Sequence, residues 1–188
     1  LWRNDLLEKA PRLRFIQSIG AGTDQFGRDG LSARGIRLAS ASGVNMKAVS
    51  EHAMALILAL ARRLPEARDN QAKHHWRGMI GDLTRREDEL GGKTLLIVGL
   101  GKIGGRLARL AKAFDMHVIG VRRDPAAGKD AADSVHAMAD LNSLLPQADI
   151  VALTCPMTKE TEDLIDADAL GRMKKSAFLI NTARGGIV

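Results

Sequence analysis

The fold is decided by one stretch, Thr94-Leu95-Leu96-Ile97-Val98-Gly99-Leu100-Gly101-Lys102-Ile103-Gly104. Its first part is a continuous apolar run, which is typical of a strand buried on both faces of a parallel sheet. A GxGxxG motif follows directly, and apolar residues at helical spacing continue through residue 114. Such glycines allow a tight turn, the close approach of a pyrophosphate and close packing of helix on strand. We therefore predict a dinucleotide site where a helix over 102–114 begins; the alternative is a tight strand-to-helix turn without a ligand.

The alternation of strand and helix continues after this motif. Strands are predicted at 116–121, 150–153 and 177–180, and helices at 138–145 and 166–173. Strands that alternate with helices form parallel pairs joined by right-handed crossovers. The predicted fold class is therefore α/β, with a doubly wound parallel sheet of the Rossmann type.

The N-terminal part of the chain has a different pattern. Short strand-like runs at 13–18 and 35–40 are separated by glycines, and a long helix is predicted over 46–64, ended by Pro65. A polar, highly charged connection is predicted over 78–89. We expect two units, namely part of a second, smaller domain over 1–44 and the dinucleotide-binding domain over 45–188.

Composition and charge exclude several classes of protein. The net charge is +6, but aromatic residues make up 3% of the 188 residues and Tyr is absent, so we expect no nucleic-acid partner. Small anionic ligands explain the positive sign. The apolar stretch at 53–61 is far short of the roughly 20 residues of a membrane span, so no membrane partner is expected. The single cysteine, Cys155, excludes an internal disulfide and predicts a cytoplasmic protein. His74 and His75 have no further ligands at a useful spacing, so we expect no metal.

The residues after the second predicted strand bear on the choice of dinucleotide. Sites for NAD place an Asp or Glu about 20 residues after the glycine motif, but Arg122 and Arg123 stand at this strand end. A guanidinium binds the 2′-phosphate of NADP through paired hydrogen bonds. NADP is therefore slightly preferred over NAD. The alternative is that both arginines are solvated and that Asp124 serves NAD.

Five segments of the chain stand in a characteristic order: SIGAGTD (18–24), VSEHA (49–53), GGKT (91–94), the stretch from ADIV to CPMT (148–158) and LINTARGGIV (179–188). With them, the sequence resembles the D-isomer-specific 2-hydroxyacid dehydrogenase family over essentially its whole length. The resemblance implies that residues 1–44 are part of a flavodoxin-like substrate domain. It also implies a homodimer, to which the helix at 46–64 contributes.

The resemblance implies roles for individual positions. Arg184 corresponds to the catalytic arginine that holds the substrate carboxylate and carbonyl oxygen, although a surface arginine in a turn is the alternative. Ala21 and Gly22 correspond to a loop whose amides bind the substrate carboxylate. Asn45 corresponds to a substrate-contacting asparagine and fits a helix N-cap equally well. The expected cofactor-binding residues are Gly99, Gly101, Lys102, Ile103, Gly104, Arg122 and Arg123, with Thr154, Cys155 and Pro156 beside the adenosine and Thr182 and Ala183 near the nicotinamide.

The activity that the resemblance implies is reduction of a 2-oxo acid by NAD(P)H to a D-2-hydroxy acid, with glyoxylate or hydroxypyruvate as substrate. The family's general-acid histidine and its glutamate lie beyond the arginine motif, and the chain ends at Val188, so we expect an inactive fragment. One alternative is a dinucleotide-sensing binding protein of the same fold, such as a transcriptional corepressor. Another is a different Rossmann dehydrogenase, such as an amino-acid or S-adenosylhomocysteine enzyme, which does not predict the segment from Asn181 to Gly186.

Overall fold

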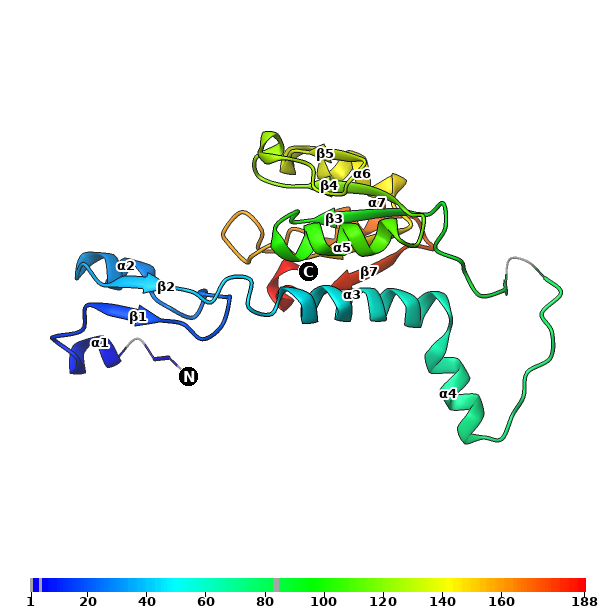
Figure 1. The fold of residues 1–188 in the computed structure, drawn as a ribbon, viewed down its shortest axis with the longest axis horizontal. Helices are drawn as coiled ribbons and strands as arrows, with labels where there is room; N and C mark the ends of the chain where they lie inside the picture. The colour runs from blue at the N-terminus through cyan, green and yellow to red at the C-terminus, as the bar shows by residue number, and fades with distance from the viewer. Residues whose placement is uncertain (1, 4, 83–84) are drawn as a thin grey trace.

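The computed structural model describes residues 2–3, 5–82 and 85–188, and these form two parallel sheets of unequal size (Figure 1). The larger sheet has the strand order β5-β4-β3-β6-β7. Its strands are β3 (Thr94–Val98), β4 (His117–Val121), β5 (Ser134–His136), β6 (Ile150–Leu153) and β7 (Phe178–Asn181). The smaller sheet pairs β1 (Phe15–Gln17) with β2 (Arg37–Ala39). The predicted doubly wound sheet of the Rossmann type is confirmed.

The strand order creates the place where a ligand can bind. From the central β3 the chain adds β4 and β5 on one side, then returns to add β6 and β7 on the other. The carboxyl ends of β3 and β6 therefore lie side by side, with Val98 paired to Leu153. In open α/β sheets, ligands bind in the crevice at such a reversal of strand order.

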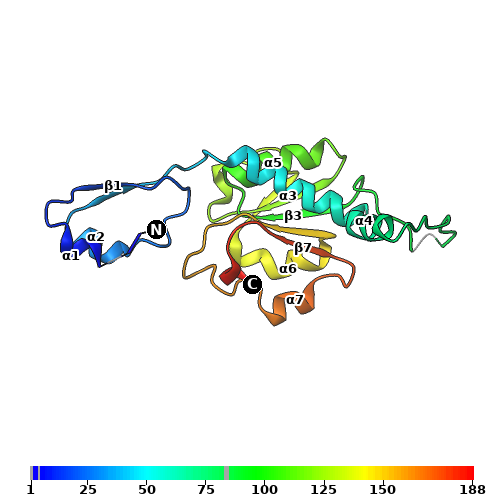
Figure 2. The ribbon, with the colours of Figure 1, turned by 90° about the horizontal axis from the view of Figure 1, so that it is seen from below.

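Helices cover both faces of the large sheet (Figure 2). On one face, α3 (Met46–Ala61) and α5 (Lys102–Lys112) pack together over Leu95 and Ile97. On the other face, α6 (Leu141–Leu144) and α7 (Ala167–Arg172) lie in the cluster that contains Leu96 and Val98. Successive side chains of a strand point to opposite faces, which explains why β3 consists of apolar residues throughout.

Residues 2–44 form what we call the small lobe, and residues 45–188 form the large lobe. The small lobe holds β1, β2, α1 (Leu6–Lys9) and α2 (Arg28–Ala33) around a cluster of Phe26, Leu31 and Ile36. It stands apart from the large sheet, and its only covalent connection to that sheet is the segment that enters α3 (Figure 1). The boundary between domains at residues 44 and 45 stays a prediction.

The prediction of one helix over 46–64 is wrong at its C-terminal end. Helix α3 stops at Ala61, Arg63 has a positive φ of 49°, and a second helix, α4 (Leu64–Ala72), begins there. Pro65 lies in the first turn of α4, where the missing N–H and the fixed φ of proline are tolerated. Proline therefore marks the start of a helix here and not its end.

Smaller differences concern short elements. The helix predicted at 138–145 is divided into η3 (Met138–Asp140), α6 and η4 (Leu145–Gln147), with Pro146 inside the last. Strand β5 was not predicted, because three half-buried residues give no periodic signal. Further 3-10 turns are η2 (Pro125–Ala127) and η5 (Gly185–Ile187). Positions 83 and 84 of the predicted connection lie outside the described residues. Within the described part of the chain, no helix combines the length and the apolar character that a membrane span requires.

Candidate functional site

The glycine loop lies between β3 and α5, at the reversal of strand order. Gly99 has a φ of 102°, in the left-handed region that favours glycine. An added Cβ at Gly99 would overlap the backbone nitrogen of Cys155, and one at Gly104 would overlap the carbonyl oxygen of Gly99. These two glycines are therefore required by the packing of the protein itself. Gly101 differs, since no atom lies within 4 Å of the position of its Cβ.

The open space at Gly101 lies at the N-terminus of α5, which suits the binding of an anion. Gly101 is the N-cap of α5, and no side chain caps this end of the helix. The first amides of a helix have no partner within the helix and carry partial positive charge. The amides of Lys102 and Ile103 belong to this first turn, so the residues present fit the pyrophosphate of a dinucleotide.

The loop after β4 lies on the adenosine side of the expected site. The Arg122 guanidinium donates a hydrogen bond to the carbonyl oxygen of Gly128 at 2.8 Å, while Arg123 is exposed. The Asp124 carboxylate accepts a hydrogen bond from the amide of Ala126 at 3.0 Å and caps η2. The acid that could serve the ribose of NAD is thus engaged within its own loop, whereas Arg123 is exposed and lies close enough to Glu160 for their charges to interact.

The loop after β6 packs directly against the glycine loop. The Thr154 hydroxyl donates to the carbonyl oxygen of Gly99 at 2.9 Å. Cys155 is buried, and burial raises the pKa of its thiol, so the group stays protonated at neutral pH. The carbonyl oxygen of Pro156 accepts a hydrogen bond from the hydroxyl of Thr161 at 2.7 Å. The structure therefore brings these predicted cofactor-side residues next to the glycine motif.

The turn after β7 presents Arg184 at the same edge of the sheet. The amide of Thr182 donates to the carbonyl oxygen of Leu153 at 3.3 Å, which places this turn beside the end of β6. The Asn181 side chain accepts from the amide of Ala183 at 3.0 Å and donates to the carbonyl oxygen of Arg184 at 2.8 Å. Asn181 thus shapes the turn, a role that the sequence analysis did not assign although the residue lies inside the quoted motif.

Arg184 reaches across to the small lobe. Its guanidinium forms an ion pair with Asp24, with Nη2 3.1 Å from Oδ1 and Nε 3.3 Å from Oδ2. A side chain at Gly22 would overlap this guanidinium. The structure therefore brings Arg184 together with the predicted Ala21–Gly22 loop. Asp24 was not expected to take part, although it ends the first motif segment.

Two further predicted residues lie where the lobes join. The Lys102 ammonium donates to the carbonyl oxygen of Ser42 at 3.2 Å, so this side chain turns toward the connecting segment. Asn45 is exposed and occupies the N-cap position of α3, but its side chain makes no capping hydrogen bond. Its contact with a substrate stays a prediction.

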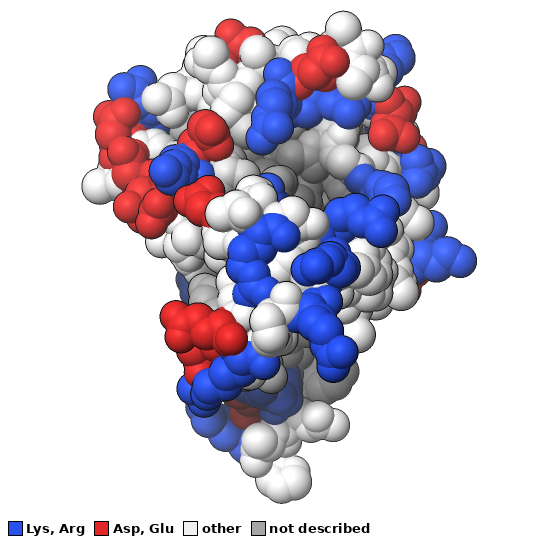
Figure 3. Space-filling view, turned by 90° about the vertical axis from the view of Figure 1, so that its left-hand side faces the viewer, with Lys and Arg blue, Asp and Glu red and all other residues white. Residues whose placement is uncertain are grey.

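The small lobe lies on the side of the molecule to which the large sheet presents its strand ends. Because β7 runs toward the small lobe in Figure 1, the carboxyl ends of all five parallel strands face that lobe. Figure 3 views the molecule from this side, with the small lobe nearest the viewer, and Lys and Arg side chains predominate across the middle of that view. Within the described ranges, no group of three or more His, Cys, Asp or Glu side chains could hold a metal ion.

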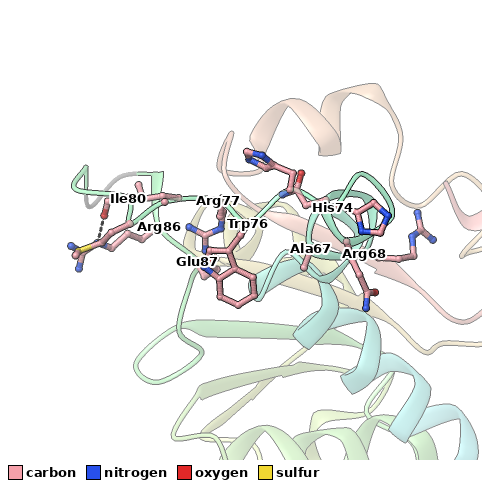
Figure 4. A pocket seen from close by; sticks show the side chains of 13 residues that line it. Ala67, Arg68, His74, Trp76, Arg77, Ile80, Arg86 and Glu87 are labelled. Carbon is pink, nitrogen blue, oxygen red and sulfur yellow. Dashed lines mark hydrogen bonds and ion pairs between the residues drawn. The ribbon is translucent and has the colours of Figure 1, made fainter.

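A large hollow of about 1080 Å³ lies elsewhere, between α4 and the chain that follows it (Figure 4). Its lining includes His74, His75 and Trp76, and the Trp76 side chain is 96% exposed. Figure 1 shows that α4 and this following chain extend away from the large sheet. The hollow is thus remote from the glycine loop and does not belong to the candidate site.

Comparison with known proteins agrees with this geometry. Residues 54–188 match the family model described as D-isomer specific 2-hydroxyacid dehydrogenase, NAD binding domain. The chain is 36% identical over 187 residues to D-3-phosphoglycerate dehydrogenase of Methanocaldococcus jannaschii, covering 98% of this chain and 34% of that protein. It is 37% identical over 186 residues to glyoxylate/hydroxypyruvate reductase B of Pectobacterium atrosepticum, covering 98% of this chain and 57% of the reductase.

The chain also resembles a solved structure of a 2-hydroxyacid dehydrogenase. The crystal structure of D-lactate dehydrogenase from Aquifex aeolicus with NAD and lactic acid superposes with a TM-score of 0.87 at 31% identity, covering 99% of this chain and 54% of that one. The chain therefore spans between about a third and just over half of the proteins that it resembles.

Proposed function

The chain belongs to the D-isomer specific 2-hydroxyacid dehydrogenase family, and from this premise we propose that it forms part of an NAD(P)-dependent oxidoreductase that reduces a 2-oxo acid to a D-2-hydroxy acid. The observation that carries the proposal is the position of Arg184. Its guanidinium lies against Gly22, at the sheet edge that also holds the glycine loop. A permanently charged group beside a dinucleotide site suits a carboxylate substrate.

The residues of this chain account for part of the reaction. A bound nicotinamide supplies the hydride for the carbonyl carbon of the 2-oxo acid. Arg184 binds the substrate carboxylate and stabilises the negative charge that develops on the carbonyl oxygen. The amides of the Ala21–Gly22 loop hold the carboxylate from the other side, and Asn45 contacts the substrate. Closure of the small lobe about a hinge near Val44 excludes water.

The proton for the product hydroxyl has to come from another group. In this proposal it comes from the histidine that the family resemblance implies, with a glutamate that orients it, both outside residues 1–188. The coverage of relatives supports this arrangement, since the chain spans 34% of the phosphoglycerate dehydrogenase and 57% of the reductase. On this view residues 1–188 alone bind a dinucleotide without turning over substrate.

Glyoxylate or hydroxypyruvate is the proposed substrate. The similarity to the Pectobacterium atrosepticum reductase supports this choice, although the other relatives carry names that refer to phosphoglycerate and lactate. A kinetic survey of the full-length protein with these 2-oxo acids, under NADPH and NADH, is the test. We expect turnover of glyoxylate or hydroxypyruvate to the 2-hydroxy acid, with the D isomer formed from hydroxypyruvate. Dinucleotide binding without turnover of any 2-oxo acid would reject the enzyme and favour a dinucleotide-sensing binding protein.

NADP is the proposed cofactor, in preference to NAD. Exposed Arg123 supports it, and so does the engagement of the Asp124 carboxylate with the amide of Ala126. A charge-assisted hydrogen bond contributes roughly 1.5–3 kcal/mol, so NADPH is expected to bind about tenfold or more tightly than NADH in a fluorescence titration. Arg123→Gln should remove most of this difference, whereas Lys129→Gln in the same loop should leave it. Equal affinity of the wild-type protein for both dinucleotides would reject NADP preference.

A homodimer is proposed as the functional assembly. Helix α3 exposes Leu56 and Leu60, and Met79 and Trp76 on the chain after α4 are 93% and 96% exposed. Large exposed apolar side chains are a feature of surfaces that another protein covers. Analytical ultracentrifugation of the full-length protein should give a dimer that Trp76→Glu dissociates, and a wild-type monomer would reject the proposal. Cytoplasmic location stays a prediction from the cysteine content.

A further inference from the structure

The ion pair between Asp24 and Arg184 joins two residues that the sequence analysis did not connect. Asp24 lies in the loop after β1 in the small lobe, and Arg184 follows β7 in the large lobe. Among the residues that the structure describes, this is the one ion pair that crosses between the lobes. The side chains are 41% and 44% exposed, so a ligand entering between the lobes can reach the guanidinium.

The hydrogen bonds of Arg184 occupy one edge of its guanidinium and leave another free. Asp24 accepts from Nε and from Nη2, which together form the side-on edge. Nη1 donates to the carbonyl oxygen of Ala183 at 2.9 Å. A guanidinium has five N–H groups, so one N–H on each terminal nitrogen remains. Two such donors on adjacent nitrogens suit the paired oxygens of a carboxylate.

The surroundings fix where this free edge lies. Gly22 leaves space for the guanidinium, because an added side chain there would overlap Nη2. Asp24 itself has a lowered pKa, for which its hydrogen bond from Arg184 is the largest cause, so it is ionised at neutral pH. A charged acceptor beside a glycine therefore sets both the distance and the rotation of the guanidinium against the loop.

We propose that Asp24 is a positioning residue for Arg184: its carboxylate holds the Nε–Nη2 edge of the guanidinium against the 20–24 loop, so that the remaining N–H groups face the substrate. This inference rests on the proposed function and extends it to a residue in the small lobe. Asp24 touches neither substrate nor cofactor in this arrangement. It acts through the orientation of Arg184 and ties that orientation to the approach of the two lobes.

Removing the Asp24 carboxylate should lower turnover without weakening the binding of the substrate. In Asp24→Asn, Arg184 keeps its charge and its attraction for a carboxylate, but the guanidinium is no longer held in one orientation. Misplacement by about 1 Å can lower a rate by roughly 100-fold, so we expect kcat to fall by about ten- to 100-fold. KM should stay level or fall, because Asp24 no longer offsets the charge of Arg184. A role in folding alone would instead lower Tm and leave kcat of the folded protein unchanged.

The experiment uses the full-length protein with glyoxylate and hydroxypyruvate, and compares Asp24→Asn, Asp24→Glu and Asp168→Asn. Glu restores the charge with one additional methylene and should recover part of kcat. Asp168 pairs with Arg172 on the surface of α7, so Asp168→Asn is the matched control and should keep the wild-type kcat. The inference is overturned if Asp24→Asn keeps wild-type kcat, or if it raises kcat/KM, as expected for a carboxylate that merely blocks the substrate.

A crystal structure of Asp24→Asn separates this inference from the proposed function. The guanidinium of Arg184 should leave its position against Gly22 in the variant and keep it in Asp168→Asn. If the wild-type protein turns over no 2-oxo acid, the proposed function fails while the crystal structures still decide the role of Asp24. A guanidinium that stays in place in Asp24→Asn would overturn the positioning role.

Discussion

The two lobes differ in how far each can stabilise its own structure. In the large sheet, β6 is buried throughout and β3 from Leu95 onward, because helices cover both faces. In the small lobe, β1 and β2 have three residues each, and none of these is fully buried. A sheet of two strands is marginally stable by itself. The large lobe therefore provides most of the stability, while the small lobe contributes part of the candidate site and depends on the contacts it makes.

The largest expected effect on the free energy of unfolding comes from replacing one buried leucine by alanine in each lobe. Leu96 in β3 and Leu31 in α2 are 0% and 3% exposed. Leu96→Ala should lower the free energy of unfolding of the large sheet by about 2–5 kcal/mol, the range for Leu→Ala in a packed core. Leu31→Ala should leave that transition unchanged and weaken the small lobe alone, because its cluster is separate.

The two lobes can be followed separately during urea unfolding. Trp2 lies 5.2 Å from Phe26, centroid to centroid, so its fluorescence reports on the small lobe once Trp76 is replaced by Phe. Circular dichroism reports on the large sheet and its helices. Two transitions are expected, of which Leu31→Ala shifts only the one seen by fluorescence. A single transition that both substitutions shift equally would show that the lobes form one cooperative unit.

The glycine motif offers the next largest effect. Gly104→Ala places a Cβ against the backbone of Gly99 and the hydroxyl of Thr154, and such overpacking costs about 1–3 kcal/mol of stability. Gly101→Ala meets no atom within 4 Å, so its Tm should match that of the wild type. Both variants should lose dinucleotide affinity by about tenfold or more in a fluorescence titration. Full affinity in Gly101→Ala would place the pyrophosphate elsewhere.

The sequence was sufficient to predict four of the five strands of the large sheet, and the reason is physical. An apolar run followed by GxGxxG requires a buried strand, a tight turn and a helix in fixed order, and β3 and α5 follow this order. The second helix, α4, was missed because proline fits the first turn of a helix as well as it stops one. The β5 strand was missed because its three residues are stabilised by pairing with β4 and not by a pattern of their own.

A half-buried carboxylate, that of Asp149, lies just before β6, at the end of the large sheet opposite the candidate site. The Asp149 carboxylate accepts from the amide of Thr94 at 2.9 Å and from the ammonium of Lys174 at 2.8 Å. Burial raises the pKa of Asp149, but these two hydrogen bonds outweigh burial and hold the pKa below its usual value. A depressed pKa contributes stability above about pH 4, where the unfolded carboxyl is ionised, and this contribution disappears as the pH falls through the native pKa.

Asp149→Asn should therefore lower the free energy of unfolding by about 1–2 kcal/mol at neutral pH. The difference from the wild type should shrink when the pH falls below about 4, as measured by urea unfolding at a series of pH values. Asp69→Asn, at an exposed pair with Arg68, is the control and should follow the wild-type curve. A difference between Asp149→Asn and wild type that does not vary with pH would refute the assigned role.

The smallest expected effect on stability concerns the N-cap residues of two helices, α7 and α3. The Asp166 side chain caps α7 by accepting from the amide of Ala169 at 2.8 Å. Asn45 occupies the same position in α3 without a capping hydrogen bond. Asp166→Ala should thus cost about 1 kcal/mol, whereas Asn45→Ala should leave stability unchanged and raise the KM for the 2-oxo acid. Equal losses of stability in thermal unfolding would mean that Asn45 serves as a cap after all.

The contacts within the candidate site were harder to predict from the sequence than the fold was. Motif positions indicated Arg184, Gly22 and the glycine loop separately, but not which groups would touch one another. Contact between Asp24 and Arg184 depends on how the lobes meet, 160 positions apart in sequence. Asn181 supports its turn through two hydrogen bonds to the backbone, and no spacing of residues reveals such bonds in advance.

We propose that the small lobe and the large sheet together form one substrate site centred on Arg184. The most direct test measures kcat/KM for the 2-oxo acid and Kd for the dinucleotide in full-length Arg184→Lys. Loss of paired donors to the developing oxyanion should lower kcat/KM by about 100- to 1000-fold, while the Kd for the dinucleotide stays at its wild-type value. Unchanged turnover, or an equal loss of turnover and of dinucleotide binding, would show that the substrate site is not centred on Arg184.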